Sequence, residues 1–213
     1  MHYLRFITAL SVAFSAAVST AQLHVQPGQV GSDGCAPTTP AQICLGPTGD
    51  AHCYSPTSEK DYIFGLEPTA KEVGKLEGQP LVLFTAMFSG CGSGTLTDVS
   101  LLTPQAEALV NLLPKVRITN QSDMGLWSIP QISHLPIVAT ADFVWDFKAG
   151  ETHFSSHRYL VKAYVFDPTS GKYDEKVSYE TTTKYPGLDD EDQVHVLRAE
   201  KPTILTKLGQ QAN

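Results

Sequence analysis

The amino-acid sequence predicts a mainly β protein, an antiparallel meander or sandwich with an irregular, disulfide-stapled N-terminal arm and a short C-terminal helix. Three observations support this fold class. The apolar run Leu81–Phe88 has the pattern of a buried strand. Alternating segments separated by turn residues follow between residues 137 and 183. All four cysteines lie at or before position 91, beside stretches that are rich in Gly and Pro.

Residues 1–21 have the features of a secretory signal peptide. Arg5 gives a short positive region, and the apolar run Phe6–Val18 is too short to span a bilayer. Ser19 and Ala21 are small residues at the positions that signal cleavage requires. We therefore expect cleavage after Ala21 and a secreted or periplasmic chain. The alternatives are an N-terminal anchor and a buried helix.

Residues 22–61 form an arm that is rich in Pro, Gly, Ser and Thr and has few large apolar side chains. Such a segment buries little surface by itself, so we expect irregular structure stapled by cysteines; the alternative is a flexible linker. An even cysteine count in an exported chain predicts two disulfides. Three pairings are open, and we expect Cys91 to tie the arm to the rest of the chain. The candidate partners are Cys35, Cys44 and Cys53.

Residues 62–213 are predicted to form one β-rich domain. Leu81–Phe88 is apolar on both strand parities, which indicates a strand covered on both faces. Thr95–Leu102 alternates in part and is the expected hairpin partner. The next segment has two interpretations. Thr103, Pro104 and Glu107 resemble a helix start, whereas Ala108–Leu113 also fits a strand.

The meander is the clearest part of the sequence. Its three strands lie within residues 137–147, 157–166 and 173–183, each with alternating side chains. The first turn is expected near Gly150. The second is expected at Asp167–Lys172, where Pro and Gly favour a turn.

The C-terminal segment differs from the meander. The acidic run Asp189–Asp192 suits either the start of a helix or a solvated loop. Beyond it we expect a short helix, or two helical turns split near Pro202.

The glycine-rich stretch Ser89–Gly94 matches none of the catalytic motifs that it resembles. A phosphate-binding loop requires a lysine that is absent between Gly90 and Ser100. A hydrolase nucleophile turn requires a different spacing of glycines around Ser93. Cys91 as a thiol nucleophile would need a base from elsewhere in the chain. We therefore interpret the stretch as a hairpin turn that carries half of a disulfide.

The first meander turn concentrates polar residues that could contact a partner. They are Asp146, Glu151, His153, His157 and Arg158. On a strand, the two histidines would be about 13 Å apart, too far to share a metal ion. No cysteine pair has zinc spacing either, so we expect no metal and no cofactor.

Asp142 and Asp146 are a second candidate set. Both lie on one strand parity, again about 13 Å apart, whereas glycosidase carboxylates lie about 5–10 Å apart. A solvated strand face is the simpler interpretation of these two acids.

Charge excludes some classes of partner. The net charge is −7 and no basic stripe occurs, which argues against a nucleic-acid ligand. No further apolar segment approaches the length of a membrane span, so we expect none in the mature chain. An acidic chain suits a basic protein partner.

Residues 141–176 resemble strand–turn–strand units of secreted bacterial β-proteins of the FG-GAP-like and lysozyme-inhibitor-like kind. The matching positions are Tyr164, Phe166, Asp167, Gly171 and Tyr173. The resemblance implies a β-rich envelope protein with a binding role. The calcium loop of such proteins is not reproduced, because Lys148 stands where a ligand is needed.

The leading functional hypothesis is a non-enzymatic, exported protein that binds a protein or glycan partner through its hairpin loops, for example as an inhibitor. One alternative is a secreted hydrolase that uses Asp142, Asp146, Glu151 and His153 or His157. Another is a structural envelope protein.

Overall fold

A computed structural model describes residues 23–32, 34–46, 52–59, 62–92, 94–106, 108–146, 148–152, 154–186 and 195–211. Several sequence-based predictions lie outside these residues. They concern the signal peptide, Glu107, His153 and the acidic run Asp189–Asp192.

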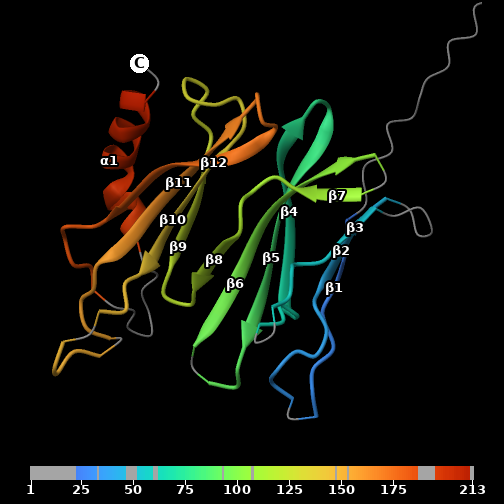
Figure 1. The fold of residues 1–213 in the computed structure, drawn as a ribbon, viewed down its shortest axis with the longest axis horizontal. Coiled ribbons are helices and arrows are strands. Elements are labelled where there is room, and N and C mark those ends of the chain that lie inside the picture. Colours follow the sequence, from blue (N-terminus) through green and yellow to red (C-terminus); the bar gives the residue numbers. More distant parts are fainter. Residues whose placement is uncertain are drawn as a thin grey trace, which may run out of the picture.

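The chain folds into layers in the order helix, four-stranded sheet, five-stranded sheet and three-stranded arm sheet (Figure 1). The arm sheet has the order β1-β2-β3, the central sheet β4-β5-β6-β7 with β8 also paired to β6, and the third sheet β12-β11-β10-β9. The bounds are β1 Leu23–Gln26, β2 Gln42–Leu45, β3 His52–Tyr54, β4 Leu66–Leu76, β5 Gln79–Ser89, β6 Thr95–Gln105, β7 Ala108–Asn111, β8 Val116–Thr119, β9 Asp123–Trp127, β10 Ile137–Phe143, β11 Tyr159–Asp167, β12 Lys172–Glu180 and α1 Val196–Gln211. The mainly β, antiparallel fold predicted from the sequence is confirmed.

Strand β5 is covered on both faces, as its apolar pattern predicts. Leu81 packs into the cluster between the two larger sheets, beside Val138 of β10. Val82 and Phe84 face the other way and pack against Ile43 of the arm. The central sheet is therefore buried on two sides, which explains why alternation is absent from β5.

The expected β5–β6 hairpin is present, and Ser89 lies opposite Thr95 in it. Beyond it, the strand interpretation is confirmed and the helix start at Thr103 is wrong. Thr103 lies in β6 and pairs with Val110 of β7. Ala106, between the strands, has φ of 52°, a left-handed conformation that reverses the chain. Burial of Leu109 in the arm-side core favours the strand over the local helix signal.

The three meander strands are confirmed as β10, β11 and β12, and β9 adds an outer edge strand. Side chains of one parity, such as Ala139 and Val161, face α1. Side chains of the other parity, such as Val138 and Tyr164, face the central sheet. The second turn closes where Gly171, with φ of 67°, donates its N–H to Asp167 O at 2.9 Å.

Two disulfides staple the arm. Cys44–Cys53 joins neighbouring strands β2 and β3, and Cys35–Cys91 joins the arm to the β5–β6 turn. The expected tie through Cys91 is thus confirmed. The arm is more regular than its composition suggests, because Ile43 and Leu45 are buried against the central sheet.

A polar cluster beneath the arm joins it to the central sheet. Tyr54 of β3 shares a hydrogen bond of 3.0 Å with Ser100, whose hydroxyl donates to buried Asp98 at 2.9 Å. Arg117 lies 3.8 Å from Asp98 and 3.1 Å from Glu59 of the arm. Burial raises the pKa of Asp98, and the hydrogen bond from Ser100 opposes this effect.

Helix α1 is continuous through Pro202 rather than split there. Val196, Ile204 and Leu208 are buried against the third sheet, and this packing extends over both sides of the proline. Within the described part of the chain, no helix has the length and apolar character needed to cross a bilayer.

Candidate functional site

The connection between β10 and β11, residues 144–158, is the longest link within the meander and contains the five polar residues singled out from the sequence. It extends beyond the end of the third sheet, as the gold loop at lower left in Figure 1. Connections of this length in compact domains are often binding loops. We call residues 144–158 the β10–β11 connection.

Ion pairs hold this connection at two points. Arg158 Nη2 lies 2.5 Å from the Asp146 carboxylate, and Arg158 Nη1 lies 3.3 Å from Glu180 on β12. Lys184 Nζ lies 2.7 Å from Glu151, which also accepts the backbone N–H of Lys148. Hydrogen bonds from Arg158 and Lys184 lower the pKa values of Asp146 and Glu151, respectively, so both acids are ionised near neutral pH.

His157 lies beneath the connection rather than on its surface. Its side chain is 1% exposed, and its ring packs 4.1 Å from the ring of Phe143. Its Nε2 is 2.7 Å from Thr152 O, and its backbone exchanges two hydrogen bonds with Tyr185. These contacts fix the shape of the connection, so His157 acts here as a structural residue.

Asp142 differs from the solvated residue that its strand parity suggests. It is half-buried and accepts hydrogen bonds from the backbone N–H and Oγ1 of Thr119, at 3.2 and 3.1 Å, and from Ser122 Oγ. These residues flank the turn where the chain passes from β8 in the central sheet to β9 in the third sheet. Asp142 thus stabilises a junction between sheets.

The described members of the proposed hydrolase set, three acids and His157, are therefore engaged separately. Asp146 pairs with Arg158, Glu151 pairs with Lys184, and Asp142 binds the β8–β9 turn. Among the described residues, no group of three or more His, Cys, Asp or Glu could hold a metal ion.

Two aromatic side chains on the connection were not singled out by the sequence reasoning. Trp145 is 55% exposed and Phe154 is 65% exposed. On a continued strand, Trp145 would point inward like the buried residues Ala141 and Phe143. Strand β10 ends at Phe143, so the alternation does not extend to Trp145. The sequence feature that could have identified these two residues is the presence of large aromatic side chains in an otherwise polar segment between two strands.

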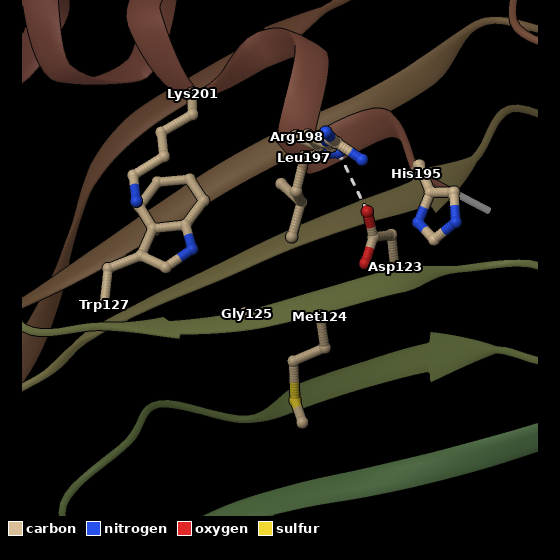
Figure 2. Close-up of a pocket in the computed structure, with 8 residues that line it drawn as sticks. All are labelled: Asp123, Met124, Gly125, Trp127, His195, Leu197, Arg198 and Lys201. Atoms are coloured by element: carbon tan, nitrogen blue, oxygen red, sulfur yellow. Dashed lines mark hydrogen bonds between the residues drawn. The ribbon is translucent and has the colours of Figure 1, made fainter. Parts of the chain in front are cut away.

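A concave feature lies between β9 and the start of α1, apart from the β10–β11 connection (Figure 2). It is a groove of about 280 Å³. It is lined by Asp123, Met124, Gly125, Trp127, His195, Leu197, Arg198 and Lys201. We call it the β9–α1 groove. Lys201 Nζ lies 4.9 Å from the centre of the Trp127 ring, a cation–π contact at one end of the groove.

Comparison with protein-family models, with curated proteins and with solved structures gives no match to this chain.

Proposed function

We propose that this chain is an exported, non-enzymatic binding protein that recognises another protein through the β10–β11 connection. The exposure of Trp145 and Phe154 on one connection carries the proposal. Large aromatic side chains are the residues that most often dominate protein–protein binding energy.

Contacts among the described residues of the connection order it without a partner. The Asp146–Arg158 pair spans its length, and the buried ring of His157 bonds to Thr152 within it. Ordering a loop on binding costs free energy, so a loop that is already ordered binds more tightly for the same contacts. The polar residues predicted to contact a partner thus support the aromatic ones.

A protein partner fits this surface better than a glycan. Sugar hydroxyls are usually bound by carboxylates and amides beside an aromatic ring, but Asp146 and Glu151 already accept hydrogen bonds from Arg158 and Lys184. Breaking these pairs to bind a sugar would cost part of the affinity. Trp145 and Phe154 offer exposed apolar surface, which suits contact with a protein.

Export is part of the proposal and has two supports. The chain contains two disulfides, which persist in oxidising compartments. Residues 1–21 carry the sequence features of a signal peptide. The resemblance to inhibitor-like secreted proteins agrees with a protein partner, and the net charge of −7 favours a basic one.

Affinity capture from the extracellular fraction of the source cells tests the proposal. The wild-type chain and a Trp145→Ser/Phe154→Ser variant are immobilised in parallel. A Val30→Ser variant, which alters an apolar side chain that is 43% exposed in the arm, is the matched control. We expect a protein that binds the wild type and the control but not the double variant. With that protein purified, each single substitution should weaken binding by about tenfold or more.

Two results would contradict the proposal. One is capture that is equal on all three chains. The other is saturable binding to a glycan array that requires Trp145 and Phe154, with no protein captured, which would identify a carbohydrate ligand instead.

A further inference from the structure

The β9–α1 groove is built from two elements that are distant in sequence. The odd-numbered residues of β9, Asp123, Gly125 and Trp127, face the helix (Figure 2). Leu197, Arg198 and Lys201 line it from the first two turns of α1. The described residues that line the groove are separate from those of the β10–β11 connection.

Gly125 forms the floor of the groove. A Cβ atom at this position would lie 2.8 Å from Trp127 Nε1 and 3.6 Å from Leu197 Cδ1. The first distance is shorter than a van der Waals contact, so any larger residue would displace the indole. Glycine here lets the Trp127 indole lie close against the β9 backbone, on the side of Gly125 opposite to Asp123 in Figure 2.

Several hydrogen-bond donors around the groove have no acceptor among the described residues. The Arg198 guanidinium makes no ion pair or hydrogen bond there, and the Trp127 indole N–H makes none either. Among the described residues, the ammonium group of Lys201 has a cation–π contact with the Trp127 ring and no ion pair. Asp123, the acid among the described lining residues, already accepts the backbone N–H of Leu197 at 2.9 Å.

Among the described residues that line the groove, the permanent cations outnumber the carboxylates. The cations are Arg198 and Lys201 and the carboxylate is that of Asp123, whereas the whole chain has a net charge of −7. A concave site with unused donors favours a ligand that brings acceptors and negative charge. The planar guanidinium matches a carboxylate with two parallel hydrogen bonds.

From this geometry we infer that the β9–α1 groove binds a small organic carboxylate. The carboxylate group lies against Arg198, and the body of the ligand extends along β9 toward the Trp127 indole and Lys201 at the other side of the groove. A volume of about 280 Å³ is below that of typical drug-sized pockets and suits a molecule with a single ring. Aromatic acids and sugar acids share this chemistry.

Tryptophan fluorescence can report binding at this site. The chain has two tryptophans, so a Trp145→Phe variant leaves Trp127 as the sole reporter. The probes are benzoate and D-glucuronate, with benzyl alcohol and D-glucose as neutral counterparts. We expect a saturable change with one or both acids, up to about 10 mM, since a small single-ring ligand binds weakly. Tighter binding of benzoate would indicate an aromatic acid as the ligand class, and tighter binding of D-glucuronate would indicate a sugar acid.

Substitutions in the same background then locate the ligand. Arg198→Gln should weaken carboxylate binding by about tenfold or more, because it removes a charge-assisted contact from an exposed position. Lys207→Gln, on the same helix but outside the groove, is the control and should change affinity less than about twofold. The inference is overturned by any of three outcomes: neither acid binds, the neutral counterparts bind equally, or Arg198→Gln binds as the parent does.

Discussion

The carboxylate of Asp123 on β9 accepts a hydrogen bond of 2.9 Å from the backbone N–H of Leu197 in the first turn of α1. The first turn of the helix has no acidic residue of its own. A strand 74 residues earlier therefore supplies the acceptor for an N–H that the helix leaves unsatisfied. Burial raises the pKa of Asp123, while the hydrogen bond from Leu197 lowers it.

This contact predicts the effect of changing Asp123. Asp123→Ala should lower the free energy of unfolding by about 1 kcal/mol, the usual cost of losing a helix-capping acceptor. Asp123→Asn, which keeps an acceptor oxygen, should cost less. Urea denaturation followed by circular dichroism measures both. Equal losses for Ala and Asn would show that the hydrogen bond is not the source of the stabilisation.

The two disulfides should differ in their contribution to stability. Cys35–Cys91 closes a sequence separation of 56 residues and Cys44–Cys53 one of 9. The chain-entropy model predicts that the disulfides stabilise the folded state by about 4 and about 2.7 kcal/mol, respectively. Replacing each pair by alanine and measuring urea denaturation should therefore show the larger loss for Cys35/Cys91. A larger loss for Cys44/Cys53 would indicate that packing of the arm, rather than loop entropy, determines how much each disulfide stabilises the protein.

Buried Asp98 should make stability depend on pH in an identifiable direction. Its pKa is raised in the folded state, so the folded state binds this proton more tightly than the unfolded state does. The contribution of Asp98 to the free energy of unfolding is therefore greatest below the pKa that Asp98 has in the unfolded chain. This contribution is lost as the pH rises through the pKa of Asp98 in the folded state.

Comparison with Asp98→Asn isolates this effect, because asparagine keeps the acceptor for Ser100. The stability of the wild type relative to the variant should increase as pH falls from about 7 to about 4. Urea denaturation at several pH values measures the difference. A difference that decreases over this range would mean that the attraction of Arg117 outweighs burial.

The exposed aromatics should contribute more to binding than to folding. Trp145→Ser/Phe154→Ser removes side chains that are 55% and 65% exposed, together with the edge contact of Trp145 on the Phe143 ring, so the free energy of unfolding should fall by no more than about 1.5 kcal/mol. Phe143→Ala, by contrast, truncates a buried ring in contact with His157 and should cost about 3–5 kcal/mol. Thermal and urea unfolding of the two variants test this. A large loss for the double variant would assign Trp145 and Phe154 to the core.

The sequence was most informative where structure depends on neighbours along the chain. The alternation in residues 159–167 and 172–180 places side chains on two faces, and the turn at Asp167–Lys172 needs only Pro and Gly. It was less informative around Thr103, where a helix-start signal lies within β6. There the partner strand β7 and burial of Leu109 decided the outcome.

The sequence by itself determined the β-rich class, the meander, the β5–β6 hairpin and the tie through Cys91, because strand periodicity, turn residues and cysteine content are local properties. Only the tertiary structure decided that Cys35 is the partner of Cys91, that Trp145 is exposed, and that Asp123 meets α1. Each of these depends on which layers pack together and where a strand ends. Such facts follow from long-range burial, which no single stretch of sequence records.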